Sequence, residues 1–386
     1  MVPNGWVVKN LDSIYRVIDS LHQTPSFSKD GEYRMVRVTD IKGKNLDLSN
    51  AVRVSKEVFL EYTKKYKPKR NDILFSRVGS YGISSFIHTD QEFCLGQNTV
   101  IAESNDQANP IYIFNVLKSE GIRRQVEKTV DGSSHKTVSL KVIKDLKIPL
   151  APRKEQNKIA QILSTWDQAI SVTEKLLENS QEQKKALMQQ LLTGKKRLLD
   201  ENGGEFSDEW QRIELGLLLD YQQPTPYLVE STAYSDSYET PVLTAGKTFI
   251  LGYTNESSGI YQDQLPVIIF DDFTTDSKYV NFPFKAKSSA MKILTAKKGV
   301  SIKFVFEAMQ MLQFTVGGHQ RHWISIFSNL VIPLPNKKEQ QQIAEVLSLA
   351  DQEIETLQKK LDCLQQEKKA LMQQLLTGKK RVKVAA

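Results

Sequence analysis

Apolar residues recur at alternating steps of four and three along two long stretches of the chain. The second stretch has them at Ile343, Leu347, Ala350, Ile354, Leu357, Leu361, Leu364, Leu371 and Leu375. The first stretch keeps the same register through Ile159, Leu163, Trp166, Ile170, Thr173, Leu177, Ser180, Lys184, Leu187 and Leu191. Heptad spacing sustained over about five repeats predicts two long helices, each with one apolar seam that needs a partner.

Both stretches belong to an internal repeat. Residues 184–197 return letter for letter as residues 368–381, and shorter matches at the same offset of 184 positions reach upstream to residues 149 and 333. Each copy follows a larger globular segment, and these two segments share little sequence apart from the run into the helix. The chain is therefore predicted to be a duplicated protein.

Local signals mark where the two predicted helices begin and end. Pro152 stands in the first turn of one copy, and Asn336 with Glu339 three residues later has the form of a capping pair at the start of the other. Gly194 and Gly378 stand where a helix would end.

Two like helices in one chain can pair about a pseudo-two-fold axis, which closes, or by translation, which leaves an open end. The dyad is favoured; it makes the helices antiparallel and sends the two globular segments to opposite ends of a rod. The alternative is that each helix packs on its own globular domain. The predicted fold class is α+β, with two mixed α/β domains joined by two long helices that form an antiparallel intramolecular coiled coil with pseudo-two-fold symmetry.

The predicted domain order follows from the repeat and from composition. Short apolar runs at 33–38, 72–75 and 98–102, separated by Gly, Asn and Asp, are typical of a mixed or β-rich domain. The predicted ranges are a first globular domain at 1–150, a long helix at 151–197, a polar linker at 198–209, a second globular domain at 210–334, a second long helix at 335–381 and a tail at 382–386.

Charge and cysteine content narrow the class of partner and the compartment. The 386 residues have a net charge of +7, which favours an acidic partner such as nucleic acid. Cys94 and Cys363 lie far apart, so no disulfide framework is expected. No signal peptide opens the chain, and no apolar stretch approaches the ~18 residues of a membrane span. We expect a cytoplasmic protein with no membrane partner.

Candidate DNA contacts in the first domain gather in polar, basic loops. Cations that alternate with tyrosines at 61–70 suit phosphate contacts, although a solvated lysine-rich loop is the plain alternative. Polar loops between glycines, or just before a strand, suit base reading, although plain turns fit as well. The candidates are Lys64, Lys65, Lys67, Lys69, Arg70, Arg77, Ser80, Tyr81, Gln97, Asn98, Ser134, His135 and Lys136.

Candidate contacts in the second domain have the same character. They are Lys247, Thr274, Thr275, Lys278, Lys285, Lys287, His319, Gln320 and Arg321. We expect lysines such as Lys285 and Lys287 to contact phosphates and so fix the register of the protein along the DNA. The residues expected to reach base edges are Arg77, Gln97, Asn98, His319, Gln320 and Arg321.

Catalytic motifs are missing from the sequence. Both Thr-Gly-Lys-Lys runs lack the upstream glycine of a phosphate-binding loop and end helices instead of starting them. His319 and His322 have no cysteine or carboxylate cluster nearby to complete a zinc site, so no metal site is expected. The acids at 271–276 with Lys278 resemble a nuclease core only superficially, because their spacing is too short for two adjacent strands.

The whole pattern resembles the specificity (S) subunit of Type I restriction–modification enzymes. The resemblance rests on two unlike domains, each followed by a Pro-Leu-x-x-x-Lys-Glu-Gln…Ile-Ala…Leu-Ser…Asp-Gln…Ile helix at 154–170 and 338–354. The runs at 37–41 and 72–77 also look like those of target-recognition domains in this family. The second domain has no equivalent of residues 37–41, so its assignment depends on position and on the helix that follows.

The resemblance implies a DNA-reading subunit without an active site. Each variable domain would read one half of an asymmetric, bipartite DNA sequence, and the helix pair would set the spacer. Two modification subunits carrying S-adenosylmethionine would dock along the helices, and restriction subunits using ATP and Mg²⁺ would join through them, in defence against foreign DNA. No cofactor is expected on this chain itself. The other classes left open are a coiled-coil scaffold without sequence-specific DNA binding and an enzyme of unrecognised chemistry.

Overall fold

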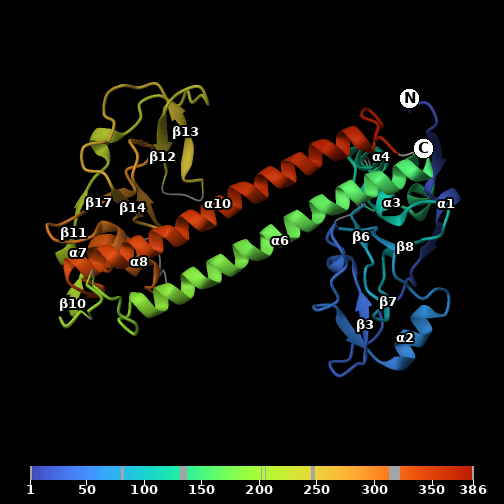
Figure 1. Cartoon of the computed structure of the whole chain (residues 1–386), viewed down its shortest axis with the longest axis horizontal. Coiled ribbons are helices and arrows are strands. Elements are labelled where there is room, and N and C mark those ends of the chain that lie inside the picture. The colour runs from blue at the N-terminus through green and yellow to red at the C-terminus, as the bar shows by residue number, and fades with distance from the viewer. Residues whose placement is uncertain are drawn as a thin grey trace. The chain divides into compact units, whose positions relative to one another are not determined.

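The computed structural model describes residues 2–79, 82–130, 137–200, 202–204, 206–244, 248–312 and 322–384. The chain folds as two compact units. Unit 1 comprises Met1–Glu174 with Lys360–Ala386, and unit 2 comprises Lys175–Lys359. Each unit therefore holds one globular segment, the first part of one long helix and the last part of the other (Figure 1).

The globular segment of unit 1 contains nine short strands and five short helices among its described residues. The strands are β1 (Val7–Asn10), β2 (Arg16–Asp19), β3 (Tyr33–Val36), β4 (Val52–Val54), β5 (Ile73–Ser76), β6 (Ser84–Phe86), β7 (Phe93–Leu95), β8 (Thr99–Glu103) and β9 (Lys147–Leu150). The α-helices are α1 (Leu11–Ile14), α2 (Lys56–Thr63), α3 (Pro110–Leu117), α4 (Glu120–Val130) and α5 (Leu140–Asp145), and a 3₁₀ turn, η1, covers Val38–Asp40. The three predicted apolar runs are confirmed as β3, β5 and β8. The strand expected just after residue 138 is instead the helix α5, which Ser139 caps by accepting from the Val142 N–H.

The globular segment of unit 2 repeats this order with fewer helices. Its strands are β10 (Gln211–Glu214), β11 (Leu219–Gln222), β12 (Thr240–Leu243), β13 (Ile250–Thr254), β14 (Val267–Asp271), β15 (Ser277–Val280), β16 (Lys285–Ala286), β17 (Met291–Ala296) and β18 (Val331–Leu334). Its helical turns are α7 (Leu215–Leu218), η2 (Thr225–Tyr227), α8 (Ile302–Gln310), α9 (His322–Ser325) and η3 (Phe327–Asn329).

The two globular segments have one topology. Unit 1 has an antiparallel sheet in the order β2-β8-β5-β6, a sheet β4-β3-β7 with one parallel pair, and the pair β1-β9. Unit 2 has β11-β17-β14-β15, β13-β12-β16 with one parallel pair, and β10-β18. The order of strands is the same, element for element, although the two sequences share little. The helices α2 and α4 of unit 1 have no counterpart among the described residues of unit 2.

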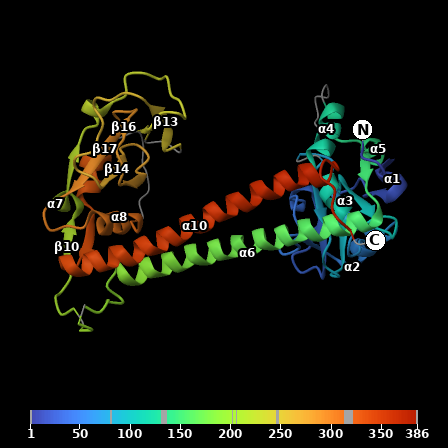
Figure 2. The same ribbon diagram turned by 45° about the horizontal axis from the view of Figure 1, so that its top comes forward.

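Each long helix runs without a break, α6 over Arg153–Leu191 and α10 over Lys337–Leu375. Within each unit the two run antiparallel and side by side (Figure 2). All the seam positions of both helices are buried or half-buried, including Thr173, Ser180 and Lys368, where the apolar pattern is interrupted. The predicted antiparallel coiled coil is thus the observed arrangement, and the helices also pack on the globular segments, as the alternative proposed.

The pseudo-two-fold relation shows in contacts that recur with exchanged roles. In unit 2 the Lys184 ammonium lies 2.6 Å from Asp351, and in unit 1 Lys368 pairs with Asp167. Lysine and aspartate each sit 184 positions from their counterparts. This reciprocity is what an isologous pairing requires.

A second recurring contact closes the end of each helix pair. The buried Glu339 carboxylate accepts from Trp210 Nε1 at 3.1 Å and from two nitrogens of Arg197 at 2.6 and 3.0 Å. Glu155 accepts from Trp6 and Arg381 in the same way. We call each set the Glu–Arg–Trp clasp. It explains why the repeated motif extends past the helix end to an arginine.

The expected helix ends are largely confirmed. Asn336 accepts from the Glu339 N–H at 3.0 Å, but the Glu339 side chain does not complete a capping box because it belongs to the clasp. Gly194 and Gly378 have φ of 71° and 69°, the left-handed conformation of a helix C-terminus. The last helical residues are Leu191 and Leu375, each three positions before its glycine.

Two leucines just past the helix ends also contribute to the cores. Leu192 and Leu376 are 2% and 1% exposed, because they pack into the cores of the globular segments. No helix of the described residues is long and apolar enough to span a membrane.

Glu339→Gln should lower the free energy of unfolding by about 2–4 kcal/mol, because it leaves a partly buried guanidinium without its charged partner. Urea unfolding of the full chain, followed by circular dichroism, measures the loss. Glu355→Gln on the same helix is the control, since Glu355 forms only an exposed pair with Lys359 and should cost less than ~0.5 kcal/mol. Equal effects of the two substitutions would contradict the role given to the clasp.

Candidate nucleic-acid interface

The basic run of the first domain lies at the end of α2 and in the loop that follows. Lys64 is exposed, and among the described residues it forms no ion pair. Lys67, Lys69 and Arg70 each pair with an acid, namely Glu92, Glu103 and Asp90. Lys65 donates to the Asp19 carbonyl at 3.4 Å. Because exposed pairs contribute at most ~1 kcal/mol, these cations remain able to exchange a carboxylate for a phosphate.

The tyrosine in this run has a structural role. The Tyr66 hydroxyl donates to the buried Asp72 carboxylate at 2.6 Å, and Asp72 also accepts from the Ser104 and Lys69 N–H groups. Burial raises the pKa of Asp72, although these hydrogen bonds oppose the shift. Burial and the bond to Asp72 raise the pKa of Tyr66. Tyr66 therefore anchors the basic loop at Asp72, just before β5.

Arg77, predicted to read a base, is held by the protein itself. Its side chain is 15% exposed, with Nη1 2.8 Å from Asp19 and Nε donating to the Val138 carbonyl at 3.0 Å. Val78 forms a β-bridge with Thr137. The contacts of Arg77 and Val78 thus join the chain just before one predicted polar loop to the chain just after the other. Arg77 therefore fits an anchoring role better than a base contact.

Gln97 and Asn98 form the turn between β7 and β8. Asn98 has a left-handed φ of 63°, and its carbonyl accepts from the Arg77 N–H at 3.0 Å. Gln97 is exposed and accepts from the Thr24 hydroxyl. The structure thus places Arg77, Gln97 and Asn98 together at one edge of unit 1, and it leaves Gln97 the most accessible of the three.

The polar loop between β14 and β15 presents Thr274 and Thr275 in unit 2. Thr275 has φ of 64° and donates its N–H to the Asp271 carbonyl. Lys278 follows on β15 and is exposed. This loop is accessible, as a base-contacting loop must be.

Asp272, beside this loop, is the centre of a buried polar network that the sequence did not reveal. Its carboxylate lies 3.3 Å from the Lys292 ammonium and accepts from the Trp323 N–H at 2.9 Å, while His322 bonds to its carbonyl. Asp272 and Lys292 are 2% and 1% exposed. The acids here serve packing, and no group of three metal-ligating side chains occurs among the described residues. The one sequence feature that could have indicated the Asp272–Lys292 pair is the apolar character of the strands β14 and β17 beside it.

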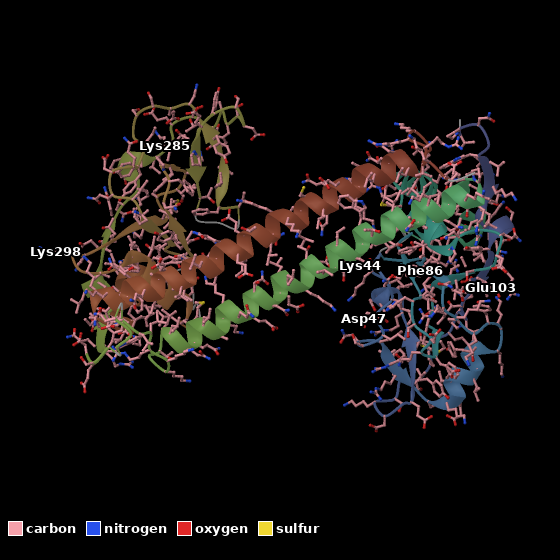
Figure 3. All side chains as sticks on the ribbon, viewed as in Figure 1. Lys44, Asp47, Phe86, Glu103, Lys285 and Lys298 are labelled. Carbon is pink, nitrogen blue, oxygen red and sulfur yellow. The ribbon has the colours of Figure 1, made fainter. Side chains whose placement is uncertain are left out.

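Lys285 and Lys287, two residues apart, have opposite placements. Lys285 is 2% exposed, lies 2.7 Å from Glu256 and donates to the Ser258 carbonyl at 2.7 Å (Figure 3). The prediction that Lys285 contacts phosphate does not fit this burial, so Lys285 leaves the candidate set. Lys287 is exposed, and among the described residues it forms no ion pair.

Several candidates lie outside the described residues. They are Ser80, Tyr81, Ser134, His135, Lys136, Lys247, His319, Gln320 and Arg321. Their roles remain predictions from the sequence.

Comparison with known proteins decides between a DNA-reading chain and a scaffold. The family model described as the Type I restriction modification DNA specificity domain matches residues 3–180 and 207–366, most of the chain. This chain belongs to the Type I restriction–modification DNA specificity family. The two matched ranges contain the two globular segments, so both halves of the chain carry the specificity domain.

Individual relatives agree with this family. The putative type I restriction enzyme MjaX specificity subunit of Methanocaldococcus jannaschii is 28% identical, covering 99% of this chain and 95% of the relative. The EcoR124I/EcoR124II specificity subunit of Escherichia coli is 54% identical over 132 residues, 33% of this chain and 32% of the relative. That second alignment spans about a third of the E. coli specificity subunit.

A solved structure shares the fold of the specificity chain. The Type-I restriction-modification system S subunit from M. genitalium aligns over 97% of both chains with a TM-score of 0.67 and 17% identity. At this identity the likeness concerns the fold alone.

Lys285 in β16 and Lys287 just after it provide a paired test. Lys287→Met should lower the slope of log binding constant against log salt by about 1 if its ammonium neutralises one phosphate. Lys285→Met should leave that slope unchanged and destabilise the protein by roughly 2–4 kcal/mol, because it strands Glu256. Filter binding at several salt concentrations and urea unfolding measure the two effects. A changed salt slope in Lys285→Met, without loss of stability, would reverse the assignment.

Proposed function

We propose that this chain is the non-catalytic subunit that recognises DNA sequence in a Type I restriction–modification complex. Each globular segment reads one half of a bipartite site. The observation that carries this proposal is the same strand order found twice with different loops. A shared scaffold holds the loops in equivalent places, and the loop residues supply sequence preference.

The DNA site is asymmetric in this proposal. The first domain offers Gln97 and the basic loop after α2, whereas the second offers Thr274, Thr275 and Lys278 from a different turn. Because these side chains differ in hydrogen-bonding capacity, the two half-sites differ in sequence.

Phosphate contacts and base contacts are divided among accessible residues. We assign the exposed cations Lys64, Lys278 and Lys287 to phosphates, with Lys65, Lys67, Lys69 and Arg70 able to join after releasing their present partners. Gln97, Thr274 and Thr275 are the described residues assigned to base edges. Phosphate contacts fix the register and base contacts supply specificity.

The helix pair sets the number of unspecified base pairs between the half-sites. Support comes from the composition of α6 and α10, each 39 residues long without an internal glycine or proline. Two modification subunits carrying S-adenosylmethionine dock along these helices in the cytoplasm, and restriction subunits using ATP and Mg²⁺ join through them.

Methylation mapping tests the function directly. When this chain is co-expressed with its modification subunit in a host without other methylases, N6-methyladenine should appear at one split, asymmetric motif. Sequencing with modified-base detection would give both half-sites and the spacer. The control is the modification subunit alone.

Two outcomes would contradict the proposal. Methylation of the same motif without this chain would place recognition in another subunit. A palindromic methylated motif would contradict the assignment of different half-sites to the two domains.

A further inference from the structure

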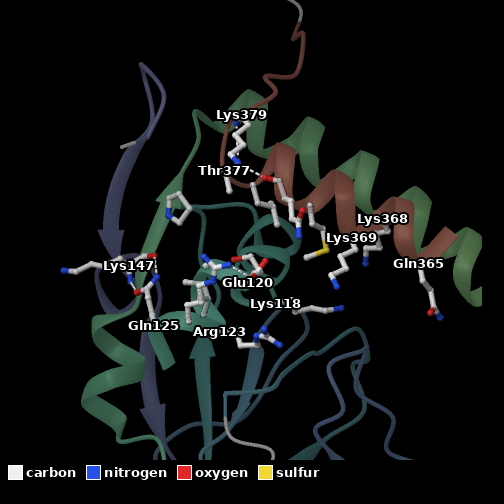
Figure 4. A pocket seen from close by; sticks show the side chains of 18 of the residues that line it. Lys118, Glu120, Arg123, Gln125, Lys147, Gln365, Lys368, Lys369, Thr377 and Lys379 are labelled. Atoms are coloured by element: carbon white, nitrogen blue, oxygen red, sulfur yellow. Dashed lines mark hydrogen bonds and ion pairs between the residues drawn. The ribbon is translucent and has the colours of Figure 1, made fainter. Parts of the chain in front are cut away.

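A cavity of ≈800 Å³ lies within unit 1, between α4 and the C-terminal part of α10 (Figure 4). Part of its lining is apolar, from Ile122, Ile170, Met372 and Leu376. The rest is polar and mostly basic. The proposed function uses none of these side chains.

Positive charge dominates the lining. Seven lysine and arginine side chains face a single carboxylate, that of Glu120, which already pairs with Arg124. Lys368 pairs with Asp167 on α6. Lys118, Lys369 and Lys379 form no ion pair with any described residue. Concentrating cations around one apolar floor costs free energy unless an anion offsets it.

At the equivalent place in unit 2, carboxylates of the protein itself neutralise the lysines. Lys184, the counterpart of Lys368, pairs with both Asp351 and Glu307, and Lys303 pairs with the same two acids. Burial lowers the pKa of Lys303, but these carboxylates outweigh it and the pKa is raised. Two cations thus meet two acids.

Unit 1 has different side chains at this place. Helices α3 and α8 begin alike, because the Asn109 N–H donates to Gln156 as the Ser301 N–H donates to Gln340. Counting from these caps, Asn115 stands where α8 has Glu307. The Asn115 amide oxygen is buried and has no hydrogen-bond partner among the described residues. By the same count Ile111 stands where α8 has Lys303, so unit 1 lacks one cation and one acid here, and Lys368 pairs with Asp167 alone.

The pKa of Lys118, one of the lysines that line the cavity, is lowered. Lys118 is exposed along its side chain, yet the surrounding protein removes water from its ammonium, and this desolvation lowers its pKa to about 8. Lys368 on α10 and Lys44 lower it further, and Asp167 on α6 opposes them. Arg123 on α4 lines the same wall. A bound anion would restore the charged form.

The basic cavity continues toward the candidate interface. A second cavity of ≈310 Å³ shares Lys118 and Arg123 with the first and extends to Gly43, Gly82 and Ile83. Gly82 belongs to the glycine-bounded loop that follows β5. The two cavities therefore lie side by side along α4.

We propose that this cavity binds the phosphate groups of a nucleotide ligand. Lys118, Lys369 and Lys379 receive the phosphates, and Ile122, Ile170 and Met372 receive an apolar ring. The volume and the mixture of an apolar floor with a few charged groups are those of a small-ligand site. The source of the phosphate is a free nucleotide or a nucleotide of bound DNA; only the DNA source rests on the proposed function.

The repeat supplies a matched control for the test. Lys369→Glu with Lys379→Glu changes the cavity in unit 1. Lys185→Glu with Lys195→Glu makes the same changes 184 positions earlier, in unit 2, and all four lysines are exposed. Full-length protein of each kind is titrated by calorimetry with ATP, with inorganic triphosphate and with a short duplex that lacks the methylated motif.

Each pattern of results decides the proposal. Affinity for ATP at least tenfold lower in the unit 1 variant alone supports a free nucleotide, and stronger binding of ATP than of triphosphate supports the apolar floor. Duplex affinity lowered in the unit 1 variant alone, without ATP binding, assigns the site to DNA. Equal losses in both variants, or no loss in either, would overturn the proposal. Methylation mapping tests the proposed function and the titrations test the cavity. A failure of one proposal can therefore be told from a failure of the other.

The pH dependence gives a second readout. Because a bound anion favours the charged Lys118, ATP affinity should fall as pH rises through about 8, and Lys118→Met should weaken binding below pH 8 and flatten this dependence. Affinity independent of pH between 7 and 9 in the unaltered chain would remove Lys118 from the site.

Discussion

The Glu–Arg–Trp clasp is the contact on which both units depend. A helix with a single apolar seam is stable only against a partner, and here the partner is nearly two hundred residues away in the chain. Glu155 and Glu339 join the beginning of one helix, the end of the other and the tryptophan that opens a globular segment. A buried carboxylate is costly without such partners, so the contact fixes the register of the pair as well as joining it.

The helix pair and the globular segments depend on the sequence in different ways. The repeated motifs specify the helix pair and are nearly identical, whereas the strands of the two globular segments reach one topology with different residues. A sheet core requires apolar side chains of suitable size at alternating positions and tolerates many choices. The clasp requires particular charges and donors. The region that differs between the two halves is therefore the one to which the proposed function assigns recognition.

The seam, the helix caps and the duplication were predictable because each has a local sequence signal. The candidate site was less so. Lys285 and Lys287 look alike in the sequence, but Lys285 lies in β16, paired with β12, and is buried, whereas Lys287 follows the end of that strand and is exposed. Arg77 likewise resembled a base reader, but its guanidinium is occupied by Asp19, 58 residues earlier. Burial and pairing of charges depend on contacts distant in sequence, which periodicity does not encode.

The division of the chain has a consequence for its synthesis on the ribosome. Unit 2 is one continuous stretch, Lys175–Lys359, and all its contacts are available once that stretch has emerged. Unit 1 begins at the N-terminus but needs Lys360–Ala386, including Leu375, Leu376 and Arg381, to complete its core and its clasp. The unit made first is thus completed only after Lys360–Ala386 has been made, and the seam of α6 in unit 1 stays uncovered until then.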